Sequence, residues 1–247
     1  MFPYYKLTLT RNKDEAVIDK ATGIGDARFK IDHFDWFIPH YTPSLDHEKI
    51  LVKQIVDKTP TQLRYFESSV VMKEVNNQKL WNFKLGAQET MDVPVWVTVG
   101  FQQQDRQDSQ KLNNCTFCRL PVVSAQCIIG TEKYPDTEML INYDNDDYIQ
   151  GYHHIKQAFK ALTKDDILQP YISDDDFTSS NAAANDVGYN LYVFDIRYQK
   201  NYTASQSIKV VLKFDGVIPP NTNGYALVLT NKLISISSDG HRHVDLI

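Results

Sequence analysis

The sequence predicts an all-β fold: an antiparallel jelly-roll β-sandwich of about eight strands with one inserted α-helix. Three observations favour it. Most apolar segments are short and alternate with polar residues, as half-buried strands do. Helices do not separate these segments regularly, which excludes a Rossmann fold and a TIM barrel. Only the segment 147–162 has a strong helical period.

Five segments of the first half have the composition of strands. In Leu80–Leu85, Trp81, Phe83 and Leu85 share one face, whereas Val93–Phe101 is nearly continuously apolar and is expected to be buried on both faces. A weaker helical period covers 45–58. The five expected strands are 29–38, 62–72, 80–85, 93–101 and 117–129.

The second half predicts the inserted helix and three further strands. Apolar residues spaced four, three, four and three apart predict the helix, namely Tyr148, Tyr152, Ile155, Phe159 and Leu162. Asp144 and Asn145 are its expected N-caps. The strands are expected at 189–198, 208–214 and 225–230, the last continuing through 233–237.

Length and composition are compatible with one domain. The chain has 247 residues, of which 42% are hydrophobic, and this is enough for a large core without disulfide or metal support. We therefore expect a single jelly-roll domain over 1–247. Its parts are an N-terminal extension at 1–27, the inserted helix at 147–162 and an exposed loop at 173–187.

The net charge and the N-terminal sequence limit the partners and the location that we expect for the chain. The formal net charge is -5 and no lysine or arginine run is present, so direct nucleic-acid binding is not expected. The N-terminus lacks the apolar core of a signal peptide. No apolar run is long enough to span a bilayer. We expect no membrane insertion and no secretion by a signal of its own.

Residues that could perform chemistry do not form a recognisable catalytic or metal motif. Cys115 and Cys118 make a CxxC pair without the second pair that a zinc site needs, so all three cysteines are expected to be structural thiols. The acidic run from Asp144 has isoleucines where a calcium loop needs Gly and Glu. The pairs His153–His154 and His241–His243 lack a third ligand. No catalytic residue, metal or cofactor is expected, and the chain is not predicted to be an enzyme.

Several ordered segments carry a family resemblance. They are Ile31–Tyr41 with a W-x-x-P-H pattern, Val93–Gln102 with V-G-F-Q, Tyr134–Tyr143 with Y-P-x-x-x-M-x-x-N-Y, Leu191–Ile196 and Tyr225–Leu229. In order and spacing, over about 28–235, the set resembles the double jelly-roll major capsid proteins of Polinton, adintovirus and virophage-like eukaryotic DNA viruses. Relatives integrated in animal genomes are catalogued as double jelly-roll-like domains.

The resemblance implies a structural protein without catalysis or cofactor. In that family two jelly rolls in one chain stand perpendicular to the capsid surface, and three chains form a pseudo-hexagonal capsomer. The expected partners are therefore further copies of the chain and other capsid components. The expected location is the virion if the chain is viral, and otherwise the cytoplasm or nucleus. The chain departs from the family in its length, since it holds one jelly roll where the family has two.

Two alternatives stay open at the level of sequence. One is a non-catalytic module that binds glycans or proteins, including a viral protein retained by a host; it predicts an exposed aromatic cluster drawn from Trp36, Trp81 or Trp96. The other is an enzyme on a jelly-roll scaffold. For assembly, the polar face of the inserted helix supplies the candidate contact residues, namely Gln150, His153, Gln157 and Lys160.

Overall fold

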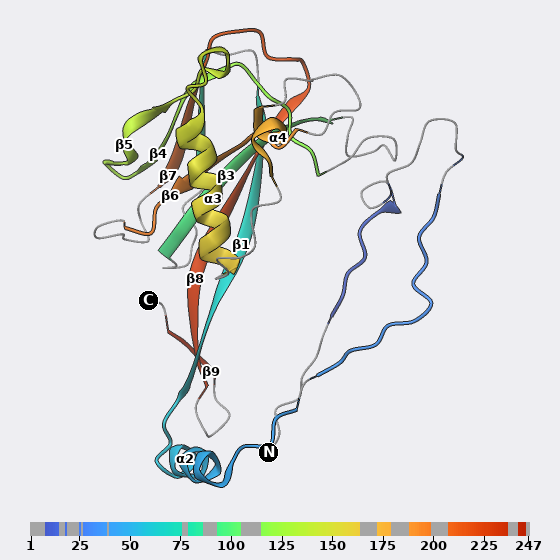
Figure 1. Ribbon diagram of the computed structural model, residues 1–247, viewed down its shortest axis with the longest axis vertical. Helices are drawn as coiled ribbons and strands as arrows, with labels where there is room; N and C mark the ends of the chain where they lie inside the picture. The colour runs from blue at the N-terminus through green and yellow to red at the C-terminus, as the bar shows by residue number, and fades with distance from the viewer. Residues whose placement is uncertain are drawn as a thin grey trace.

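The computed structural model describes residues 8–14, 18, 25, 27–38, 40–75, 79–85, 93–104, 115–163, 172–178, 188–198, 207–236 and 242–245. Two antiparallel sheets face each other. Two long strands of one sheet, β1 (Thr61–Val75) and β8 (Thr222–Ile236), extend beyond the sandwich toward a separate helix (Figure 1). The predicted extension at 1–27 lies largely outside the described residues.

The first sheet has the strand order β1-β8-β3-β6. Its members are β1 (Thr61–Val75), β8 (Thr222–Ile236), β3 (Val93–Gln103) and β6 (Leu191–Asp195). A short strand, β9 (Arg242–Asp245), pairs with the end of β8 beyond the last β3 partner. Because β1 is the first strand in this order, one of its two edges has no strand partner among the described residues.

The second sheet has the order β2-β7-β4-β5. Its members are β2 (Leu80–Leu85), β7 (Ile208–Phe214), β4 (Val122–Ile129) and β5 (Glu132–Leu140). Across both sheets the antiparallel pairs are nested, because β1 pairs with β8, β2 with β7, β3 with β6 and β4 with β5. This nesting confirms the predicted jelly-roll sandwich.

The core between the sheets is built from strand alternation. Along β2, Trp81, Phe83 and Leu85 are buried and the residues between them are exposed, as the sequence predicts. Trp81 stacks on Phe83 with ring centroids 4.9 Å apart and meets Phe101 of β3 edge to face at 5.5 Å. The Trp81 ring also lies against Gly224 of β8, where a Cβ would come within 2.7 Å of it.

Strand β3 is buried on both faces, as its continuous apolar run predicts. Val97, Val99 and Phe101 belong to the core between the sheets. Trp96, only 1% exposed, belongs to a second cluster beneath the helix α3 (Ile149–Thr163). The helix therefore covers the outer face of the first sheet, so that β3 lies between the inter-sheet core and α3. Helix α3 packs along β6 (Figure 1).

The helices differ from the prediction in two places. Asp144 and Asn145 do not cap α3. They lie in a 3-10 turn (Tyr143–Asn145), and their backbone N–H groups donate to the Asn142 side-chain oxygen Oδ1. The predicted exposed loop 173–187 contains a short helix, α4 (Asp174–Thr178), and its Phe177 is buried. Residues 179–187 lie outside the described part of the chain.

The predicted strand at 29–38 is wrong. These residues have no regular secondary structure, and their side chains are exposed. Strand-forming residues need a neighbouring strand to complete the backbone hydrogen bonds, and none lies beside this segment in the described chain. The weaker helix predicted over 45–58 is present as α2 (Leu45–Val56), which joins this segment to β1.

Candidate interaction surfaces

Exposed apolar side chains are concentrated in one stretch of the chain. Among the described residues, 18 of the 26 exposed large hydrophobic side chains lie between positions 29 and 72. Single exposed apolar residues are ordinary, but so many on three consecutive elements of the chain indicate candidate interaction surfaces. The stretch contains three elements: the segment 29–38, called the arm below, then α2 and then β1.

Helix α2 has an apolar face that none of the described residues covers. Leu51, Val52 and Ile55 lie on one side of the helix, and α2 has no buried residue. An open pocket of about 440 Å³ lies beside this face and is lined by Val52 and Val56 among other residues of the helix. A 12-residue helix is marginal alone, because most helical stability comes from packing of the apolar face. The apolar face of α2 is therefore a candidate contact surface.

Strand β1 carries a second apolar surface. It pairs with β8 in unbroken register over its 15 residues. Val71 and Val75 face the core, whereas Phe66, Val70 and Met72 point the other way and are 45–63% exposed. A long, apolar edge strand is a template for pairing with another chain.

The predicted contact residues of α3 form a solvent-facing surface. Gln150, His153, Gln157 and Lys160 are all exposed, and the Gln157 amide lies 2.9 Å from the His153 ring nitrogen Nε2. On the opposite side of the helix, Ile155 and Ala158 are buried against the sheet. The structure thus presents these four residues outward, and their role in assembly remains a proposal.

An aromatic cluster holds α3 and α4 to the sandwich. Phe177 lies 5.7–6.2 Å from the rings of Tyr143, Tyr148 and Tyr152. The Tyr143 and Tyr192 hydroxyl oxygens are 3.2 Å apart. Burial holds the pKa of the Tyr192 hydroxyl well above its ordinary value, so this hydroxyl stays protonated and serves as a structural hydrogen-bonding group.

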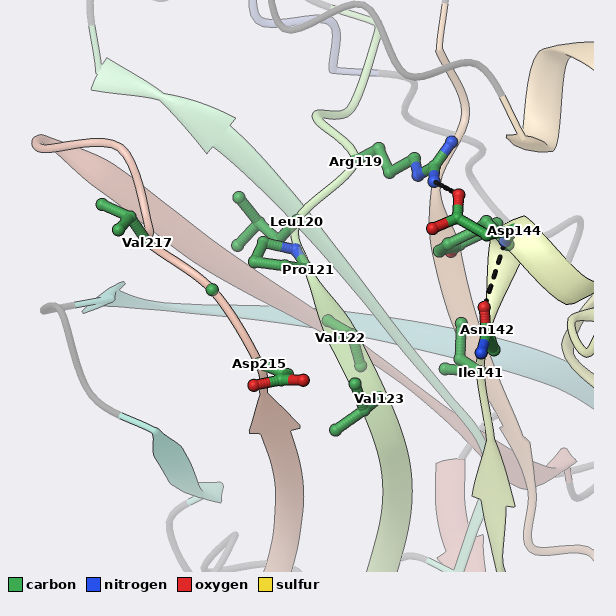
Figure 2. Close-up of a pocket in the computed structure, with 12 residues that line it drawn as sticks. Arg119, Leu120, Pro121, Val122, Val123, Ile141, Asn142, Asp144, Asp215 and Val217 are labelled. Carbon is green, nitrogen blue, oxygen red and sulfur yellow. Dashed lines mark hydrogen bonds and ion pairs between the residues drawn. The ribbon is translucent and has the colours of Figure 1, made fainter.

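One open pocket, of about 510 Å³, lies beside this cluster (Figure 2). Arg119 lies at its rim and points toward Asp144, with 3.9 Å between Nη2 and the carboxylate. The same guanidinium lies 4.1 Å over the Tyr143 ring and donates to the Thr178 carbonyl at 2.9 Å. Because Arg119 is engaged by three partners, it ties α4 to the sheet and is not poised to bind an anion.

The described residues contain no group of three or more His, Cys, Asp or Glu side chains placed to hold a metal ion. The side chains of His241 and His243 lie outside the described part. Among the described residues, no helix is long and apolar enough to cross a membrane.

The thiols should differ sharply in reactivity. Cys115 is exposed, Cys118 and Cys127 are buried, and burial raises the pKa of the Cys127 thiol to about 12. Thiolate is the reactive form, so native protein should give one rapidly reacting equivalent with Ellman's reagent and denatured protein three. Two rapid equivalents in native protein would show that the region around Cys118 opens readily.

The tryptophans do not form the cluster that glycan stacking requires. Trp81 and Trp96 are both 1% exposed and belong to the two apolar cores, and only Trp36 is half exposed. The three tryptophans therefore give the glycan-binding alternative one exposed indole in place of a cluster.

The nested pairs and the helix between β5 and β6 define a jelly-roll β-sandwich. The chain belongs to the double jelly roll-like domain family, whose match covers residues 3–234. This confirms the resemblance found in the sequence motifs. A search of curated proteins finds no match.

Solved viral capsid structures show similarity to the chain at low identity. A chain of the Sputnik virophage has 8% identity and a TM-score of 0.41, with 76% of this chain and 39% of that chain covered. The mavirus major capsid protein has 14% identity and a TM-score of 0.32, with 76% and 41% covered. The PBCV-1 virus capsid has 8% identity and a TM-score of 0.43, with 80% and 54% covered. The chain therefore spans about half or less of these capsid chains.

Proposed function

We propose that the chain is a structural protein of capsid type that acts by self-association, within a capsomer or a related oligomer in the virion. Family membership and the jelly-roll fold support this function. The observation that carries the self-association is the group of exposed apolar side chains between positions 29 and 72. Surfaces of this kind are covered in a working assembly, because leaving them in water is unfavourable.

Size-exclusion chromatography with light scattering tests the proposal. The wild-type chain should elute as a species larger than one chain, in a concentration-dependent way. The double variant Leu51→Gln/Ile55→Gln should associate at least tenfold more weakly. These side chains are 49% and 64% exposed, so their loss should leave the isolated fold intact.

The matched control places the same polar residue at two apolar sites of the sandwich that are more exposed than the test sites. Tyr198→Gln/Val217→Gln replaces side chains that are 80% and 79% exposed, and it should associate like the wild type. A wild-type chain that stays monomeric at high concentration in both low and high salt would contradict the proposal.

The exposed face of α3 is a second contact region within the same proposal. Gln150, His153, Gln157 and Lys160 offer polar groups of the kind found at the rim of an interface. Such rim contacts contribute specificity more than affinity, so the apolar stretch between 29 and 72 supplies most of the binding free energy.

A further inference from the structure

Resting on the self-association proposed above, we propose that the arm of one copy adds as an extra strand to the open edge of β1 in a second copy. The acceptor is a sheet edge, the donor is an extended segment, and both belong to the same chain. Pairing of this kind is β-augmentation, in which backbone hydrogen bonds give affinity and alternate side chains give register.

The acceptor edge is long. Near its C-terminal end β1 contacts β2 of the other sheet, because the Glu74 carbonyl accepts from Trp81 Nε1 at 3.4 Å and Lys73 donates to the Asn82 carbonyl at 2.8 Å. Over the rest of β1, no described strand pairs with the edge opposite β8. The open part is therefore about ten residues long, enough for a strand of ordinary length.

The donor has strand composition without a strand partner. Phe29 and Ile31 alternate with polar residues, and the aromatic and aliphatic residues that follow are strong strand formers. No proline lies within 29–38, so every residue of the arm can donate a backbone hydrogen bond. The arm spans about ten residues, which matches the open length of β1.

The arrangement of the chain favours a second copy as the occupant. In Figure 1 the arm lies away from the sandwich, to the right of β1, and α2 lies below both. An arm held in this way can reach the edge of a neighbouring sandwich, and the neighbour's arm can reach back. Such a reciprocal exchange gives a closed, self-complementary interface.

The area available is sufficient for a stable dimer. The 18 exposed apolar side chains between 29 and 72 present roughly 100 Å² each, or about 1,800 Å² per chain. A standard interface buries about 800 Å² per partner. Covering half of this apolar surface would therefore reach the standard size. The exchange would also bring α2 against the partner, which supplies the missing partner for its apolar face.

Mixed cross-linking tests the exchange in the full chain. One chain carries His33→Cys in the arm and a second, affinity-tagged chain carries Ser68→Cys on β1, both in a Cys115→Ser background. His33 and Ser68 are exposed and polar, so neither change removes an apolar contact. After mixing, a short bismaleimide should link the two different chains. Tyr198→Cys, which is 80% exposed on the sandwich, replaces the arm cysteine in the control and should give little product.

A backbone variant separates strand pairing from simple apolar contact. The N–H groups of Asp32 and Asp35 point to opposite edges of a strand, because the two residues are three positions apart. Asp32→Pro/Asp35→Pro therefore removes one N–H that faces β1 and keeps every apolar side chain, so cross-linking should fall at least tenfold. Asp32→Ala/Asp35→Ala keeps both N–H groups and should cross-link like the parent. Equal yields from the two variants would overturn the pairing.

The remaining outcomes separate this inference from the proposed function. An oligomer by light scattering that gives no arm-to-β1 product would overturn the exchange and leave self-association standing. A monomer in which only a doubly substituted chain links to itself would show that the arm covers its own β1, and would overturn both. A monomer without any cross-linked product would also overturn both.

Discussion

Replacing Trp81 with alanine should lower the free energy of unfolding by about 3–5 kcal/mol. Trp81 is 1% exposed and joins the two sheets, because it lies on β2 and meets Phe101 of β3 and Gly224 of β8. Removing the indole leaves a cavity among rigid neighbours and loses its stacking on Phe83. The hydrogen bond that the indole N–H donates to the Glu74 carbonyl, at 3.4 Å, is lost as well.

Urea denaturation followed by circular dichroism measures this loss. The matched control is Leu80→Ala on the same strand, because Leu80 is 43% exposed on the opposite face of β2. Its effect should stay near or below about 0.5 kcal/mol. If the two variants were equally stable, Trp81 would not be the contact that joins the sheets.

Alternation predicted the sandwich well because it maps directly onto the two faces of a strand. On β2 every second residue enters the core, so the sequence indicates both the strand and its buried face. On β6, Tyr192 and Phe194 enter the core between the sheets, while Val193 packs under α3 on the other face. A continuous apolar run predicted double burial on β3 for the same reason.

The failures have physical causes that a single sequence does not contain. The arm has strand-forming residues, yet a strand exists only beside a partner, and composition does not say where the partner is. Strand β5 escaped prediction because it is an edge strand with mostly partly or fully exposed side chains, and only Met139 on it is fully buried. Helix α4 has five residues and lies in a polar segment, so Phe177 is its one residue whose type indicates burial.

One candidate interaction surface could be predicted from the sequence and the other could not. The outward face of α3 could be predicted, because helical periodicity places Gln150, His153 and Gln157 opposite the buried residues. The surface made by the arm, α2 and β1 could not be predicted. Its apolar residues resemble core residues in sequence, and only the fold shows that nothing in the described chain covers them.

Replacing Phe177 with alanine should release α3 and α4 from the sheet without unfolding the sandwich. Phe177 is 1% exposed and is surrounded by the rings of Tyr143, Tyr148 and Tyr152. Its side chain also lies against Gly151, where a Cβ would be 3.5 Å from the Phe177 ring. The local cost should reach about 3–5 kcal/mol, since the lost ring leaves a cavity among the three tyrosine rings that surround it.

Hydrogen exchange detects this release residue by residue. Amides of α3 should lose protection at least a hundredfold, whereas those of β3, β7 and β8 should change little, because the core between the sheets does not include Phe177. Phe177→Leu keeps most of the buried volume and should retain most of the protection. Uniform loss of protection over both sheets would mean that the aromatic cluster and the sandwich unfold together. Release of α3 alone would show that the outward face carrying His153 depends on one buried ring.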